Sequence, residues 1–127
     1  MLAMIALGGA LGSAARYLFG GLVQRMTGVA FPVGTLAVNV SGSFIAGFLL
    51  RYFMNMQTHP FLRAALVVGF CGGFTTFSAF STETLALVEG GEYGRAFLYV
   101  LASVTLSLAA VFAGFAAGSI AIPHHSR

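Results

Sequence analysis

Apolar residues fill four long stretches of the chain, and short polar connections separate them. A transmembrane helix needs about 20 consecutive and mostly apolar residues, and each stretch reaches that length. Because the connections are shorter than about ten residues, neighbouring helices are expected to run antiparallel. The pattern predicts an all-α integral membrane protein with a single transmembrane domain over residues 1–127. The expected spans are residues 2–24, 32–54, 61–88 and 96–122.

The third apolar stretch contains residues that disfavour a continuous helix. Gly72 and Gly73 are adjacent, and the β-branched Thr75 and Thr76 follow them. Irregular backbone at membrane depth is tolerated only where it is buried or lines a polar cavity. Its free carbonyls suit a cation, and the N-terminus of the next half-helix suits an anion. We therefore predict a functional break near residues 72–76 in the middle of the membrane.

Two stripes of polar or small residues follow the second and fourth spans at a spacing of four, which places each stripe on one helix face. The stripes consist of Thr35, Asn39, Ser43 and Gly47 in the second span and Tyr99, Ser103 and Ser107 in the fourth. The Asn39 amide has two interpretations: it either joins two helices by hydrogen bonds or lines a pore with N–H donors that replace water around an anion. The hydroxyls likewise either bond back to carbonyls four residues earlier or line the same pore.

Four charged side chains fall within the expected spans, and two of them, Arg16 and Glu83, lie farthest from the span ends. An arginine inside the membrane is unfavourable unless it reaches the surface or finds partners. Arg16 therefore either snorkels to the membrane surface as a structural residue or forms part of an electropositive vestibule. Glu83 follows the predicted break, and an acid at that depth indicates a functional or water-exposed position. We expect Glu83 near a pore mouth, where it can pair with an arginine.

Phe77 and Phe80 are three residues apart, so they share one face of the helix that follows the break. The edge of a phenylalanine ring carries the positive part of its quadrupole and can therefore meet an anion. The alternative is that both rings simply pack against lipid or protein, which is the usual environment of phenylalanine.

The distribution of arginines predicts an unusual orientation. The short loops and ends place Arg51, Arg63 and Arg127 on one side of the membrane and Arg25 and Arg95 on the other. Positive charge near the spans normally decides which side faces the cytoplasm. The near balance predicts insertion in both orientations, which makes an antiparallel homodimer available.

The charged residues also exclude two classes of function. They make up only 7% of the chain, and the arginines are scattered singly, so no nucleic-acid-binding face is expected. An enzyme is not expected either, because the acids and histidines show no catalytic or metal-ligand spacing. These residues are Glu83, Glu89, Glu92, His59, His124 and His125.

Three segments, in order along the chain, resemble motifs of the Fluc (CrcB) family of fluoride ion channels. They run from Gly8 to Tyr17, from Gly34 to Gly47 and from Gly69 to Ser81, which reads Gly-Phe-Cys-Gly-Gly-Phe-Thr-Thr-Phe-Ser-Ala-Phe-Ser. The resemblance implies a fluoride-selective channel in the bacterial inner membrane that passively exports cytoplasmic fluoride and relieves its toxicity. It further implies a dual-topology, antiparallel homodimer with two pores. A structural Na⁺ at the dimer interface would be held by the backbone carbonyls of Gly72 and Thr75 from both subunits.

The resemblance also implies roles for pore residues. Phe77 and Phe80 would be the pore phenylalanines. The remaining pore contacts would be Asn39, Thr76, Ser78, Tyr99, Ser103 and Ser107. Phe74 and Ala79 stand where many fluoride channels are expected to have Leu and either Thr or Ser. The missing hydroxyl at Ala79 affects only the local lining of the pore.

Two other functions fit a small four-helix membrane protein. A proton-coupled multidrug exporter of this size also dimerises antiparallel, but it needs an acid deep in its first helix, and the first span here has none. A membrane subunit that transports nothing would use the glycines and phenylalanines for packing alone. Measurement of ion flux through the purified protein separates these functions.

Overall fold

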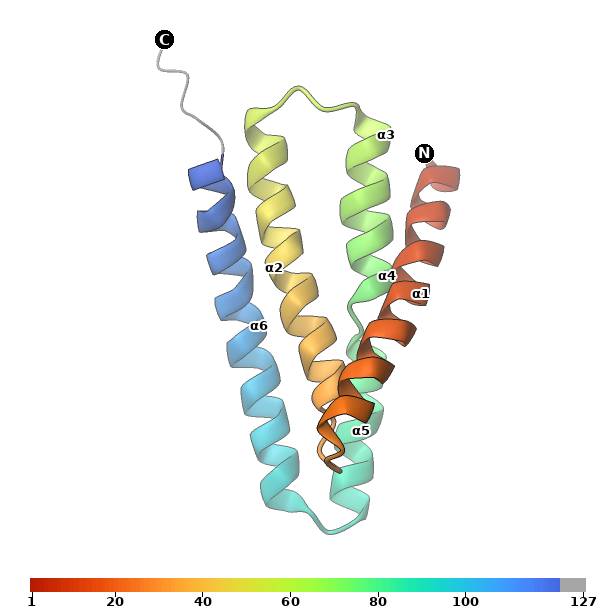
Figure 1. Cartoon of the computed structure of the whole chain (residues 1–127), viewed down its shortest axis with the longest axis vertical. Helices are drawn as coiled ribbons and strands as arrows, with labels where there is room; N and C mark the ends of the chain where they lie inside the picture. Colours follow the sequence, from red (N-terminus) through yellow and green to blue (C-terminus); the bar gives the residue numbers. More distant parts are fainter. Residues whose placement is uncertain (122–127) are drawn as a thin grey trace.

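The computed structural model describes residues 1–121, and helices make up most of that range. The chain runs through α1 (Leu2–Thr27), α2 (Val33–Asn55), α3 (Pro60–Arg63), η1 (Ala64–Cys71), α4 (Gly72–Phe74), α5 (Phe77–Glu89) and α6 (Tyr93–Ala121). The segments α3, η1 and α4 follow one another directly, and α5 continues the same rod after a break (Figure 1).

Over residues 1–121, four helical rods are long and apolar enough to cross a membrane. They are α1, α2, the composite rod Pro60–Glu89 and α6. The predicted all-α fold, with four helices long and apolar enough to span a membrane, is therefore confirmed. The predicted end of the fourth span at residue 122, and the tail residues His124, His125 and Arg127, lie outside the described residues.

Glycines let the helices of the chain approach each other closely. A methyl group at Gly8 of α1 would collide with the carbonyl of Ala65 in η1. A methyl group at Gly114 of α6 would collide in the same way with the carbonyl of Phe44 in α2. In lipid, such close backbone contacts take the place of hydrophobic drive between helices. They hold α1 beside η1 and α2 beside α6.

The helix break is shorter than the sequence predicted. Gly72 and Gly73 are helical, and only Thr75 (φ −76°, ψ 153°) and Thr76 (φ −146°, ψ 117°) have extended backbone. The prediction of a break near residues 72–76 is thus correct only for its second half. Gly73 serves packing instead, because a methyl group there would collide with the carbonyl of Gly9 in α1.

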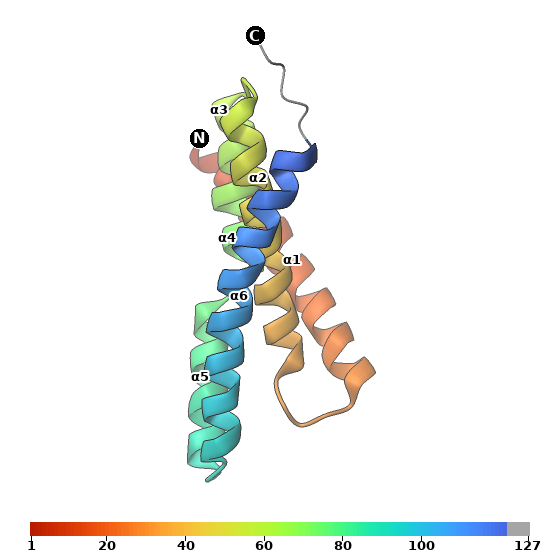
Figure 2. The same ribbon diagram turned by 90° about the vertical axis from the view of Figure 1, so that its left-hand side faces the viewer.

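The segment before the break has π-helical hydrogen bonding over Ala64–Cys71, which the sequence pattern did not predict. Such wide turns are rare and occur most often at functional sites. Beyond the break, α5 leads into α6 through a short turn, and in Figure 2 the α1–α2 connection extends to one side of that pair. Around the break, α1 and α2 pack on the segment before it, and α2 and α6 pack on α5. The elements that surround the break thus come from all four rods.

Candidate functional site

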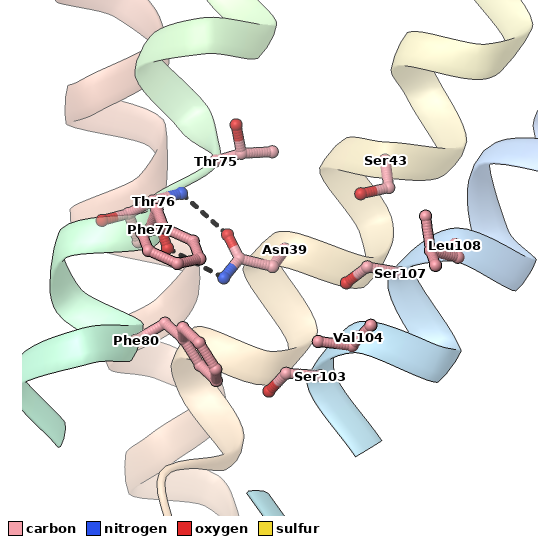
Figure 3. Close-up of a pocket in the computed structure, with 10 residues that line it drawn as sticks. All are labelled: Asn39, Ser43, Thr75, Thr76, Phe77, Phe80, Ser103, Val104, Ser107 and Leu108. Atoms are coloured by element: carbon pink, nitrogen blue, oxygen red, sulfur yellow. Dashed lines mark hydrogen bonds between the residues drawn. The ribbon is translucent and has the colours of Figure 1, made fainter. Parts of the chain in front are cut away.

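Asn39 of α2 bridges the broken third rod through its side-chain amide. Its Nδ2 donates to the carbonyl of Thr76 over 2.9 Å, and its Oδ1 accepts from the N–H of Thr76 over 2.7 Å (Figure 3). In a continuous helix this N–H would donate to the carbonyl of Gly72, four residues earlier. Asn39 therefore satisfies backbone groups that the break would otherwise leave unpaired. The first interpretation of Asn39, that its amide joins two helices by hydrogen bonds, is therefore observed in the structure.

The two threonines of the break end one half-helix and begin the next. Thr75 donates to the Cys71 carbonyl twice, from its N–H over 3.0 Å and from its Oγ1 over 2.9 Å. The Oγ1 of Thr76 accepts from the N–H of Ala79 over 3.1 Å and caps α5. The same atom lies 3.2 Å from the Oγ of Ser78. These contacts explain why the chain changes direction at the threonines rather than at the glycines.

A cavity of about 360 Å³, which we call the hydroxyl cavity, lies between α2, the break, α5 and α6. Hydroxyl, amide and aromatic groups line most of it. The lining residues are Asn39, Ser43, Thr75, Thr76, Phe77, Phe80, Ser103, Val104, Ser107 and Leu108 (Figure 3). Ser103 is buried, and its Oγ has no hydrogen-bond partner within residues 1–121. The cavity therefore contains an uncharged donor that the folded subunit does not use.

The two phenylalanines of this cavity have different surroundings. Their ring centroids are 5.4 Å apart, with an angle of 52° between the ring planes. Phe80 is buried and packs against Tyr99, with ring centroids 5.2 Å apart. Phe77 is 79% exposed. The two rings are neighbours, as their spacing predicted, but Phe77 projects from the surface of the subunit.

A second cavity, which we call the arginine recess, lies between α1, α2 and α5 and has a volume of about 440 Å³. Arg16 and Arg25 contribute to its lining from α1, Thr35 from α2 and Glu83 from α5. Thr76 lines both cavities. The structure thus brings Arg16 and Glu83, two charged residues of the expected spans, into one recess that meets the hydroxyl cavity at the helix break.

Both carboxylate oxygens of Glu83 accept hydrogen bonds from hydroxyl groups. Thr35 Oγ1 donates to Oε1 over 2.8 Å, and the Tyr99 hydroxyl donates to Oε2 over 2.7 Å. Hydrogen bonds to a carboxylate are shorter and stronger than neutral ones. The ion pair formed within residues 1–121 joins Arg95 to Glu92 at the surface. Neutral donors therefore hold Glu83 within the subunit, rather than the arginine that the sequence led us to expect.

Three residues with roles implied by the resemblance line neither cavity. Tyr99 is fully buried, and its hydroxyl points to Glu83. Ser78 and Gly72 are exposed on the surface of the subunit. The resemblance implied no pore role for Thr35. Its place in the polar stripe of the second span was the feature of the sequence that could have indicated one. Its partner Glu83 is 48 residues away, so the hydrogen bond depends on the fold.

Fold and site together define a multi-pass helical membrane protein whose broken third helix lines a cavity with hydroxyl, amide and phenylalanine side chains. Comparison with known families is more specific. Residues 3–115 match the family described as "CrcB-like protein, Camphor Resistance (CrcB)". The chain belongs to the CrcB family.

Several curated relatives share the name "Fluoride-specific ion channel FluC". The protein from Rhizobium meliloti is 50% identical over 114 residues, which cover 89% of this chain and 91% of the relative. A protein from Thermus thermophilus is 50% identical over 115 residues, with coverage of 91% and 92%. The protein from Solibacter usitatus is 50% identical over 112 residues, with coverage of 87% and 92%. The relatives are thus named as ion channels and not as enzymes.

Proposed function

We propose that this chain is a fluoride-selective ion channel of the bacterial inner membrane, through which cytoplasmic fluoride leaves passively so that its toxicity is relieved. The observation that carries the proposal is the row of uncharged donors in the hydroxyl cavity, above all the buried and unpaired hydroxyl of Ser103. Fluoride is small and strongly hydrated, so a pore must replace its water without binding it too tightly. The relatives named as fluoride-specific channels, at 50% identity, support the same conclusion.

The proposed pathway runs from the arginine recess past Thr76 into the hydroxyl cavity. Arg16 attracts the anion to the recess by its charge. Asn39 and Ser103 offer neutral donors farther in, and the ring edge of Phe80 presents the positive part of its quadrupole. Further pore roles are proposed for Phe77, Ser78, Tyr99 and Ser107. The acid at the recess, Glu83, has both oxygens occupied by hydroxyl donors, which reduces its repulsion of an entering anion.

We further propose that the functional unit is an antiparallel homodimer. Phe77 is 79% exposed, and Gly72 and Ser78, on either side of the break, are exposed as well. Irregular backbone is unfavourable next to lipid, so a second copy that covers the break stabilises it. Labelling of a single cysteine at Gln57, in a Cys71→Ser background, tests the dual topology. Labelling from both sides of the membrane is expected, and labelling from one side alone would exclude it.

A structural Na⁺ between the two copies completes the proposed assembly. Because the Thr76 N–H donates to Asn39, the Gly72 carbonyl loses the partner that it would have in a continuous helix. Thr75 has extended backbone, which turns its carbonyl away from the helical direction. Carbonyl oxygens are suitable ligands for a hard cation, so these two residues fit Na⁺. Replacing Na⁺ by a large organic cation is expected to weaken the dimer, and an unchanged dimer population would contradict the site.

Fluoride efflux from liposomes that contain the purified protein tests the function directly. A fluoride electrode follows efflux for the wild type, for Phe80→Ile and for the matched control Phe112→Ile. Phe112 is 73% exposed on α6 and lines neither cavity. The wild type and Phe112→Ile are expected to release fluoride much faster than chloride. Phe80→Ile is expected to be roughly tenfold slower, because an aromatic contact contributes up to about 1.5 kcal/mol.

The same assay decides between the remaining functions. No efflux from folded, dimeric wild-type protein would exclude a fluoride channel and leave a membrane subunit that transports nothing. Equal efflux of fluoride and chloride would exclude selectivity. The multidrug exporter is not favoured, because α1 contains no acid that could carry the coupled proton.

A further inference from the structure

We propose that Gln24 and Phe31 form a clasp that positions Tyr99, so that the Tyr99 hydroxyl keeps its hydrogen bond to Glu83 at the arginine recess. The inference rests on the proposed fluoride pathway. It adds two positioning residues, one at the end of α1 and one in the α1–α2 connection, and neither donates a hydrogen bond to the ion. The clasp links a loop outside the pore to the acid of the recess.

The amide of Gln24 bonds to the backbone of the α1–α2 connection and of the first turn of α2. Its Nε2 donates to the carbonyl of Val29 over 2.8 Å and to that of Phe31 over 3.0 Å. Its Oε1 accepts from the N–H of Gly34 over 2.9 Å. A glutamine amide has two N–H groups, and these two bonds use them. Although Gln24 lines the arginine recess, it therefore has no donor left for an anion and acts by holding the connection.

The ends of the two helices bring Gln24 within reach of the connection. Gly28 ends α1 with a φ of 61°, and its N–H donates to the backbone carbonyl of Gln24 over 3.2 Å. At the start of α2, a methyl group at Gly34 would collide with the carbonyl of Gly20 in α1. The two helices are therefore in close contact where α2 begins. This contact places the start of α2 beside α1, where Gln24 bonds to the N–H of Gly34.

The position of Phe31 matters because its ring rests on Tyr99. The two ring centroids are 5.5 Å apart, and the ring planes are at 82°, an edge-to-face arrangement. Phe80 packs on the same tyrosine ring, with centroids 5.2 Å apart. Tyr99 is fully buried, so these neighbours fix the direction of its hydroxyl toward Glu83. The amide of Gln24 and the carboxylate of Glu83 are thus joined through two aromatic rings.

Loss of the clasp has a defined consequence for the recess. When Phe31 moves, Tyr99 loses packing on one side, and its hydroxyl is free to leave Glu83. The carboxylate then keeps only the donor from Thr35 and can turn toward the recess. A carboxylate with an unoccupied oxygen repels an entering anion more strongly. Weakening the clasp is therefore expected to slow fluoride efflux.

A double-mutant cycle on fluoride efflux from liposomes tests this coupling. Gln24→Leu and Tyr99→Phe are each expected to slow efflux by roughly fivefold, the factor that corresponds to one hydrogen bond. The double variant is expected to be no slower than Tyr99→Phe alone, because both changes act through one contact. Thr27→Val is the matched control at the same helix end, since its hydroxyl bonds only to carbonyls of α1. It is expected to match the wild type.

A second variant keeps the test informative if Gln24→Leu does not fold. Phe31→Leu retains the amide of Gln24 but removes the aromatic ring, and it is expected to reproduce the slower efflux. Effects of Gln24→Leu and Tyr99→Phe that multiply in the double variant would overturn the clasp, as would wild-type efflux from both Gln24→Leu and Phe31→Leu. Either result would overturn the clasp alone and would leave the proposed channel function standing. No efflux from the wild-type protein would instead overturn the proposed function.

Discussion

The arginine recess and the hydroxyl cavity meet at Thr76, but they use their polar groups in opposite ways. The recess contains the charged side chains of Arg16, Arg25 and Glu83, and the hydroxyl groups of Thr35 and Tyr99 are both committed to the Glu83 carboxylate. In the hydroxyl cavity all the lining side chains that the structure describes are uncharged, and the Ser103 hydroxyl is unpaired within residues 1–121. A charge attracts an ion from a distance, whereas unpaired neutral donors replace its water without holding it tightly. The comparison supports the proposal that the recess attracts the anion and that the anion then passes through the hydroxyl cavity.

The largest effect is expected where the two cavities meet. Asn39→Leu removes both hydrogen bonds to Thr76 and leaves its N–H and carbonyl unpaired at membrane depth. Each unpaired buried group costs about 1–3 kcal/mol, so the free energy of unfolding is expected to fall by roughly 2–6 kcal/mol. Because the break then loses its shape, fluoride efflux is expected to be lost as well. Unfolding of the purified protein and liposome efflux measure the two effects.

Ser41→Ala is the matched control for this change on the same helix. The Ser41 hydroxyl bonds only to the carbonyls of Ala37 and Val38, within α2. Its loss is expected to change the free energy of unfolding by less than about 0.5 kcal/mol and to leave efflux unchanged. An Asn39→Leu protein that is as stable as Ser41→Ala and still conducts would show that the break forms without the hydrogen bonds from α2.

Ser103→Ala and Thr35→Val compare the two cavities most directly. Ser103→Ala removes an unpaired hydroxyl, so stability is expected to stay within about 0.5 kcal/mol of the wild type while efflux falls roughly fivefold with the lost donor. Thr35→Val removes a hydrogen bond to a carboxylate, which is expected to lower the free energy of unfolding by about 1.5–3 kcal/mol. Unfolding and efflux are measured for both variants. If Ser103→Ala and Thr35→Val lowered the free energy of unfolding equally, the donors of the two cavities would not differ in the way proposed.

The polar stripes show how much of the site follows from the sequence. The helical period places residues four apart on one face, so Ser103 and Ser107 line the same cavity as Asn39. Tyr99 belongs to the same stripe, but its side chain is fully buried and its hydroxyl donates to Glu83. Periodicity predicts the face of a helix but not the neighbour that covers part of that face. The partner of Tyr99 lies on another helix, and only the fold brings them together.

The third rod shows a similar limit for the backbone. A pair of glycines lowers helix propensity, and this predicted that the break would include Gly72 and Gly73. The close contact between Gly73 and Gly9 of α1 outweighs that preference and keeps α4 helical. The break falls instead at Thr76, where a side chain from α2 supplies the hydrogen bonds that a helix would have made. Tertiary contacts therefore decide where the break lies within a segment that the sequence identifies.

The smallest effect is expected for the charge at the recess. Arg16→Gln removes the charge but keeps a long polar side chain. Fluoride efflux is expected to fall two- to threefold at an ionic strength of about 0.01 M, and the difference is expected to fade at about 0.15 M, where the Debye length is about 8 Å. Efflux over a series of salt concentrations measures this. Arg63→Gln is the control, because Arg63 is exposed in α3 and lines neither cavity.

The salt series also separates the two interpretations of Arg16. An arginine that only snorkels contributes to insertion and packing, so the ratio of Arg16→Gln to wild-type efflux would be the same at every salt concentration. A ratio that approaches one as salt rises identifies attraction at a distance, because salt screens charges that interact through solvent. The recess would then act by its charge. Because Ser103→Ala removes an uncharged donor, its effect on efflux is expected to be independent of salt, and this contrast between the two variants is the sharpest form of the comparison.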